Sequence, residues 1–150
     1  MSDVHDKETR SYNMSRIRGK NTKPEIIVRK YLFSEGFRYR LNDIKLPGKP
    51  DIVLPKYRTV IFVNGCFWHG HQDCKYFVLP KTRTEWWYQK INKTKERDRI
   101  SHQHLNQLGY NIITVWECQL KPSIREKTLK SIIDLLYKIY LDIFKTQQNQ

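Results

Sequence analysis

Two apolar runs constrain the fold of this 150-residue chain more than any other feature: TVIFV at residues 59–63 and NIITVW at residues 111–116. The second run is almost continuously apolar, which is typical of a strand covered on both faces. The residues between them, 83–108, have the pattern of a long helix that ends at Gly109. Such a strand–helix–strand unit is expected to be a parallel crossover, so the carboxyl ends of both strands lie at one sheet edge.

A hairpin is predicted just before this crossover. The run DIVL at residues 51–54 is joined to TVIFV by the turn PKYR, which contains a proline, and this arrangement is typical of two antiparallel strands. If residue 54 pairs with residue 59, then Asp51 lies opposite Phe62 and beside Val63 and Asn64. The Asp51 carboxylate is therefore predicted at the sheet edge where the next loop begins.

Two further helices and one strand complete the predicted fold. A helix is expected over residues 22–36, with Thr22 as its N-cap and Gly36 at its end. Residues 37–43 are expected to form the first strand, and residues 124–145 an amphipathic helix. The order αβββαβα predicts an α/β domain with a mixed central β-sheet flanked by helices, in two or three layers.

The charge of the chain indicates a polyanionic partner. There are 28 Lys and Arg residues against 15 Asp and Glu residues, a formal charge of +13. Nucleic acid is the usual partner of so basic a domain, although a structural role or plain solubility would also account for the charge. We expect residues 1–24 to form a DNA-contacting arm, residues 25–145 a single domain, and residues 146–150 a disordered tail.

The cellular setting follows from what the sequence lacks. The opening residues have no apolar core of the secretory type, and no apolar run reaches the roughly 18 residues of a membrane span. Three cysteines, an odd number, argue against a disulfide framework. We therefore expect a cytoplasmic protein without a membrane partner, in which clustered cysteines bind metal or take part in chemistry.

Those cysteines have the spacing of a structural zinc site. Cys66, His71 and Cys74 form C-x4-H-x2-C, and Cys66 and Cys118 each follow a strand end at the shared sheet edge. Three thiolates and one imidazole make a closed tetrahedral set for Zn²⁺. Ordinary buried cysteines are the alternative. His71 is favoured over His69 as the fourth ligand because it is nearer Cys74, although the spacing alone leaves the choice open.

Glu25, Asp51, His69 and Asp98 are the candidate catalytic residues. Asp51 starts an apolar strand and suits Mg²⁺, which takes one or two carboxylates and fills its other positions with water and phosphate. His69 could be the general base, and Asp98 lies on the inward stripe of the long helix, where a carboxylate needs a partner. Alternatively, Glu25 completes a capping box with Thr22, and Asp51 caps a turn. The other histidines are expected on the surface: His5, His102 and His104.

Four aromatic side chains lie near these residues. Phe67 and Trp68 stand on the loop between the cysteines, and Trp86 and Trp87 open the long helix. Core packing is the ordinary explanation of such residues. On a chain of this charge, exposed aromatics beside a metal site are also suited to wedging between bases.

Taken together, the motifs resemble those of the very-short-patch repair (Vsr) endonucleases, over roughly residues 3–120. The matching runs are DVHDKETRS, NMSRIRGK, LPGKPDIV, VIFVNGCFWHGH, TRTEWW, ERD and VWEC. The resemblance implies the PD-(D/E)xK nuclease fold. It also implies a magnesium-dependent enzyme that nicks DNA 5′ of the thymine in T·G mismatches, which arise when 5-methylcytosine deaminates.

The resemblance also implies a role for each candidate residue. Asp51 and the backbone of Val63 would bind Mg²⁺, with Glu25 acting through water. Asn64 stands where some members have histidine, which leaves its part in metal binding open. His69 would be the base, and Asp98 the carboxylate that orients it. The zinc ligands would be Cys66, His71, Cys74 and Cys118. The intercalating residues would be Phe67, Trp68 and Trp87, with Met14 entering from the minor groove. The usual acid-x-Lys of the fold is replaced by Phe62-Val63-Asn64, which fits His69 activating the water.

Two other functions remain open at this point. One is a zinc-stabilised restriction-type nuclease that cuts matched DNA, and the other is a zinc-dependent DNA-binding protein without activity. For the repair enzyme we expect a monomer that works in the bacterial cytoplasm on nucleoid DNA. It would be associated in function with a DNA cytosine methyltransferase and with a repair polymerase and ligase.

Overall fold

The computed structural model describes residues 21–148. Within this range the chain forms three α-helices, four β-strands and two short 3-10 helices. In chain order they are α2 (Lys23–Ser34), β1 (Arg40–Leu41), β2 (Ile52–Leu54), η1 (Pro55–Tyr57), β3 (Thr59–Asn64), α3 (Thr84–Gln107), β4 (Asn111–Trp116), η2 (Glu117–Leu120) and α4 (Arg125–Gln148). No helix in the described part of the chain is both long and apolar enough to cross a membrane.

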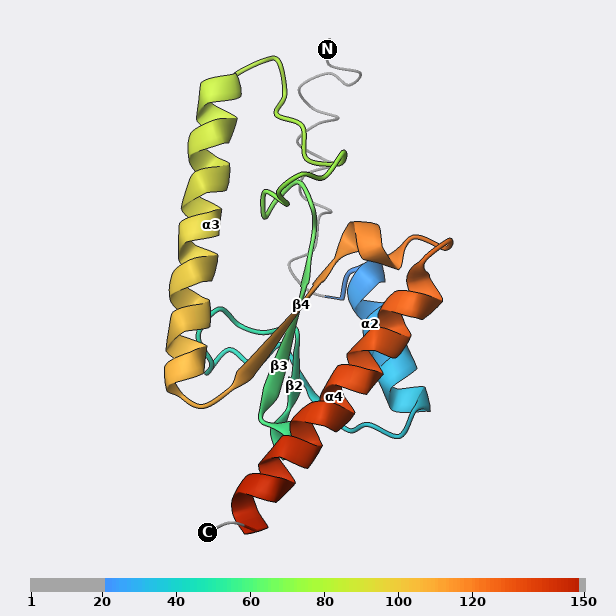
Figure 1. The fold of residues 1–150 in the computed structure, drawn as a ribbon. Coiled ribbons are helices and arrows are strands. Elements are labelled where there is room, and N and C mark those ends of the chain that lie inside the picture. Colours follow the sequence, from blue (N-terminus) through green and yellow to red (C-terminus); the bar gives the residue numbers. More distant parts are fainter. Residues whose placement is uncertain (1–20, 149–150) are drawn as a thin grey trace.

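The strands form one mixed sheet in the order β1-β2-β3-β4. Strands β2 and β3 pair antiparallel with Leu54 opposite Thr59, and β3 and β4 pair parallel with Asn64 opposite Trp116. The predicted hairpin register and the predicted parallel crossover are both confirmed. As Figure 1 shows, α3 covers one face of the sheet while α2 and α4 cover the other, so the domain has three layers.

Alternation along β3 divides the core between these two faces. Ile61 and Val63 belong to the larger apolar cluster, which includes buried residues of α2 and α4. Val60 and Phe62 belong to a smaller cluster with Leu105 of α3. Because β3 is buried at all six positions, the Asp51 end of the hairpin is fixed by packing from both sides.

The first strand is much shorter than predicted, Arg40–Leu41 instead of residues 37–43. Phe37 instead completes the end of α2, because its N–H donates to Leu32 O (3.0 Å) and the Gly36 N–H donates to Phe33 O (3.1 Å). With Gly36 at φ +92°, these bonds make a Schellman motif. The Phe37 ring is buried against Tyr57, so it serves the core rather than the sheet.

The two ends of the predicted domain also need correction. Helix α2 begins at Lys23 after its N-cap Thr22, as predicted, so residues 23–24, which the predicted arm also included, belong to the helix. Helix α4 continues to Gln148, so residues 146–148, expected in the tail, are helical. The Thr146 hydroxyl donates to Asp142 O at 2.9 Å within this last stretch, and glutamines are good helix formers. Met14 and the other residues of the arm up to residue 20 lie outside the described residues.

Candidate active site and metal centre

The hairpin and the first turn of α2 bring two carboxylates and a backbone amide to the same edge of the sheet. Asp51 accepts a hydrogen bond of 2.7 Å from the Val63 N–H, as the predicted register requires. Glu25 is only 4% exposed and lines the same cavity as Asp51. Glu25 also accepts from the Asn21 N–H at 2.8 Å, while Thr22 caps the helix. The Thr22 half of the predicted capping box is thus present, but the Glu25 carboxylate bonds the Asn21 N–H and not the Thr22 N–H.

This environment changes the acidity of Asp51. Burial is the main cause that raises the pKa of Asp51 to about 7; the charge of Glu25 and a hydrogen bond with it add to the shift, whereas the Val63 N–H and His69 oppose it. Two carboxyl groups held together out of water favour a shared proton, or a cation in its place. The donor set of hard oxygens therefore fits a divalent ion such as Mg²⁺.

A pH dependence of stability follows for the protein without magnesium. Between about pH 4 and pH 7 the native state holds a proton on Asp51 that the unfolded state has lost, so the free energy of unfolding falls as pH rises through this window. Asp51→Asn should thus raise stability by about 1–3 kcal/mol at pH 8 and change little near pH 4. Denaturant unfolding at both pH values, in buffer without magnesium, measures the difference.

Asp134→Asn is the matched control for this comparison, because Asp134 is exposed on α4. It should leave the free energy of unfolding unchanged at both pH values. If Asp51→Asn destabilised the magnesium-free protein at pH 8, the carboxylate would be stabilising in its ionised form, and the description of its environment would be wrong.

The loop after β3 places His69 against α3. The His69 N–H donates to Gly65 O at 3.2 Å, which folds the loop back on itself. The imidazole Nδ1 then lies 2.7 Å from Asp98 Oδ2, with both side chains about one-third exposed. Sequence reasoning predicted an imidazole partner for Asp98, and the structure brings the two groups together. With Nδ1 facing the carboxylate, Nε2 is the ring nitrogen left for a reactant.

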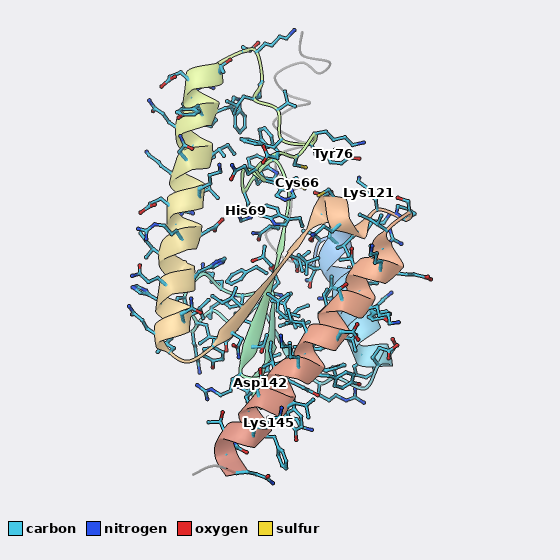
Figure 2. All side chains as sticks on the ribbon, in the orientation of Figure 1. Cys66, His69, Tyr76, Lys121, Asp142 and Lys145 are labelled. Carbon is cyan, nitrogen blue, oxygen red and sulfur yellow. The ribbon has the colours of Figure 1, made fainter. Side chains whose placement is uncertain are left out.

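These groups line one cavity of about 660 Å³. It lies at the end of the sheet where Figure 2 labels His69 and Cys66. Asp142 and Lys145, near the C-terminal end of α4, are labelled at the opposite end of the molecule. The cavity contains the predicted residues Glu25, Asp51, Val63, Asn64, His69 and Asp98. It also contains two charged residues that sequence reasoning missed, Lys49 and Glu117. Both are part of motifs quoted above, LPGKPDIV and VWEC, but nothing in those strings shows which way a side chain points.

Beside this cavity the three cysteines and His71 form a cluster. One ligand atom from each of Cys66, His71, Cys74 and Cys118 can be chosen so that all lie within 4.8 Å of one another. His71 Nδ1 is 3.5 Å from Cys118 Sγ, and its ring stacks on Trp116 with 4.0 Å between centroids. His71, and not His69, thus belongs to this group, which could hold a metal ion.

The acidity of these thiols agrees with a cluster that needs a cation to ionise. Burial raises the pKa of Cys66 to about 12 and also raises the pKa of Cys118, whereas for Cys74 the effect of burial is outweighed by hydrogen bonds with the Tyr76 backbone and the other two thiols, which lower its pKa. Three thiols this close cannot all lose their protons without a compensating positive charge. Sulfur and imidazole donors suit Zn²⁺, and binding would release the thiol protons.

The aromatic residues form a cluster between the loop and the start of α3. Phe67, Trp68 and Trp87 are mutual neighbours, with ring centroids 5.3–5.8 Å apart, and all three are half-buried. Trp86 is more exposed, at 43%. The residues predicted to intercalate therefore pack on one another, and they do not belong to either buried core cluster.

One histidine is placed differently from the prediction. His102 was expected on the surface, but it is half-buried, with its ring 4.9 Å from that of Phe62. Burial lowers its pKa, with Asp98 opposing and His69 adding to that shift. Its position four residues after Asp98 puts it on the inward side of α3, which the pattern of apolar residues alone did not indicate.

Comparison with known proteins identifies the family. A family model described as DNA mismatch endonuclease Vsr matches residues 2–76. The type II nicking enzyme V.NmeAIP of Neisseria meningitidis is 50% identical over 121 residues, which are 81% of this chain and 86% of that protein. The DNA mismatch endonuclease Vsr of Escherichia coli K12 is 48% identical over 121 residues, 81% of this chain and 77% of that protein.

This chain belongs to the Vsr family of DNA mismatch endonucleases. The Vsr family model covers Glu25, Asp51 and the loop with His69 and His71, but it ends before α3. Asp98 and Cys118 lie beyond the matched residues. The parallel crossover is what returns them to the sheet edge where the loop of His69 begins.

Proposed function

We propose that this protein is a strand-specific mismatch endonuclease of the PD-(D/E)xK type. It nicks DNA 5′ of the thymine in T·G mismatches that arise from deamination of 5-methylcytosine. The observation that carries this proposal is the His69–Asp98 pair, which shares a single cavity with Asp51 and Glu25 in a member of the Vsr family. A basic chain of charge +13 suits a duplex substrate.

Two metal ions fit the residues present. Asp51, with the Val63 carbonyl and Glu25 through water, would hold Mg²⁺, and the role of Asn64 there stays open. Cys66, His71, Cys74 and Cys118 would hold a structural Zn²⁺ that fixes the loop carrying His69. When bound, Mg²⁺ supplies charge stabilisation to a phosphate undergoing substitution.

The residues of the chain would divide the reaction as follows. His69 Nε2 takes a proton from a water molecule while Nδ1–H donates to Asp98, which keeps the ring in the required tautomer and stabilises its positive charge. The water oxygen forms a bond to phosphorus and the bond from phosphorus to the leaving sugar oxygen breaks. That oxygen then takes a proton from solvent. The product is a nicked duplex, in which one strand is broken and the other strand stays intact.

Nicking assays on three duplexes test the proposal against its rivals. We expect the purified protein with Mg²⁺ to cut a duplex with one T·G mismatch and to leave the matched T·A and C·G duplexes whole. Equal cutting of the matched duplexes would indicate a restriction-type nuclease. Binding of all three without cutting, with zinc present, would indicate a non-catalytic DNA-binding protein.

We also propose that Phe67, Trp68 and Trp87 wedge into the duplex at the mismatch, with Met14 entering from the other groove. Unstacking a base step costs a few kcal/mol, and a weakly paired T·G step should need less than a matched one. Trp68→Ala should therefore keep salt-dependent binding to matched DNA but lose about tenfold of its preference for T·G. The ratio of T·G to T·A affinities at two salt concentrations measures this.

Tyr88→Ala is the matched control, because Tyr88 is an exposed aromatic on α3 that lies outside the aromatic cluster. Core packing of Trp68 makes a different prediction: the free energy of unfolding would fall by about 3–5 kcal/mol, as it does when large aromatics are removed from cores. A destabilised Trp68→Ala protein with an intact affinity ratio would contradict the wedge.

The remaining expectations concern the setting of the enzyme. We propose that it acts as a monomer in the bacterial cytoplasm on nucleoid DNA. Its substrate arises where a DNA cytosine methyltransferase has acted, and a nick needs a polymerase and a ligase to complete repair. The two relatives described above, a nicking enzyme and a mismatch endonuclease, are from bacteria, which supports the bacterial part of this proposal.

A further inference from the structure

The charges around the active-site cavity are strongly unbalanced. Four carboxylates line it, those of Glu25, Asp51, Asp98 and Glu117. The only Lys or Arg among its described lining residues is Lys49. The phosphodiester that is cut is anionic and gains charge on its oxygens during the reaction, so positive charge is needed beside these carboxylates; the proposed Mg²⁺ would supply part of it, and a lysine can supply more. Lys49 is therefore the one lysine or arginine among the described lining residues that could contact the phosphate.

The backbone holds Lys49 at this position in an uncommon conformation. Gly48 and Lys49 are both left-handed, with φ +75° and +49°, and the Lys49 N–H donates to Leu46 O at 3.1 Å. A Cβ on Gly48 would lie 2.8 Å from the Cβ of Ser101 on α3, so glycine is required for the close approach. Lys49 is one of six non-glycine residues with positive φ in the described part of the chain, and of these six only Lys49 lines the cavity.

The residues that follow Lys49 in the chain also hold its main chain in place. Pro50 is fully buried, and Asp51 follows directly with its bond to Val63. The Lys49 side chain itself is exposed. Within the described part of the chain its ammonium group forms no ion pair with a carboxylate. Because its main chain is fixed and its side chain is exposed, Lys49 can contact an incoming ligand in a defined position.

We propose that Lys49 binds a non-bridging oxygen of the phosphate that is cut. This rests on the proposed function, since it names a further residue for the same reaction. Lys49 would bring positive charge to the phosphate from the turn before β2, while His69 and Asp98 approach from the loop after β3 and from α3. Negative charge on the phosphate oxygens changes most as the water attacks. Lys49 should therefore affect the rate of the cutting step more than the affinity for DNA.

The experiment compares three variants with the wild-type protein under single-turnover conditions, with T·G duplex and saturating protein. Lys49→Asn removes the charge and suits the left-handed backbone, and Lys49→Arg keeps the charge. Lys45→Ala is the matched control, because Lys45 is an exposed lysine of the same loop that does not line the cavity. The cleavage rate, the Kd for the T·G duplex and the melting temperature are measured for each.

We expect Lys49→Asn to slow cleavage about a hundredfold while its Kd changes less than about threefold and its melting temperature stays that of the wild type. Lys49→Arg should recover most of the rate, and Lys45→Ala should equal the wild type. If the wild type is active and Lys49→Asn cuts at the same rate, this inference is wrong while the proposed function stands. A loss of affinity as large as the loss of rate would also overturn it. A wild type that does not nick T·G DNA would overturn the proposed function and this inference with it.

Discussion

Asp51→Asn and His69→Ala should each reduce magnesium-dependent nicking of a T·G duplex by at least about a hundredfold, the range expected when a metal ligand or a general base is lost. Asp51 is held by the Val63 N–H at 2.7 Å, and an asparagine can accept the same bond, so its loss is a loss of charge and not of structure. For His69 the loss removes the base that Asp98 orients. Initial rates over a range of magnesium concentrations measure both effects.

Both variants should still bind the mismatched duplex, because neither residue belongs to the aromatic cluster. His104→Ala provides the control for histidine loss, since His104 is exposed on α3 and should leave the rate unchanged. Near-normal nicking by either active-site variant would show that its assigned role is wrong. If only His69→Ala kept its activity, another group would have to activate the water.

Cys118→Ala should release the zinc ion and cause a large fall in stability. The four ligand atoms lie within 4.8 Å of one another and join the loop after β3 to the end of β4. A structural zinc site contributes its binding free energy directly to folding, about 10 kcal/mol or more in small zinc domains. Elemental analysis of freshly purified protein, with thermal unfolding of the same sample, measures both effects. We expect one zinc per chain in the wild type and none in the variant.

His69→Ala is the natural control for this second experiment. It should retain zinc, because the His69 ring faces Asp98 and not the cysteines. His71→Ala should lose it. The reverse result would mean that the two histidines exchange roles when metal binds. Wild-type protein purified without any zinc would contradict the structural site itself.

The parts of the site that follow from strand register could be predicted from the sequence. Pairing Leu54 with Thr59 is sufficient to place Asp51 beside Val63, because side-chain direction in a strand has a fixed period. A parallel crossover then brings Asp98 and Cys118, distant in sequence, to the edge where the loop of His69 begins. Each of these predictions used only local geometry and one topological rule.

Other features depend on tertiary packing that the sequence pattern does not show. Residues 37–43 alternate like a strand, yet the end of α2 takes Phe37 into the core. His102 has the sequence context of a surface histidine, but its ring packs against Phe62. No feature of the sequence distinguishes Lys49 from the other lysines of this basic chain. Its backbone angles and the cavity beside it become visible only when the loop is folded onto Ser101.

The helix ends show the same contrast. Thr22 and Gly36 carry local capping chemistry, and the limits of α2 were predicted almost correctly from them. The C-terminal end of α4 carries no such residue. Its polar run of threonine and glutamines resembles a disordered tail in composition, although glutamine is also a good helix former.

The most direct test of the central claim is to map the nick on a T·G duplex whose two strands carry different end labels. We predict a single product in the presence of Mg²⁺, from cutting of the phosphodiester bond immediately 5′ of the mispaired thymine, with the guanine strand intact. Cutting of both strands, or of the thymine strand equally in the T·G and T·A duplexes, would contradict the account.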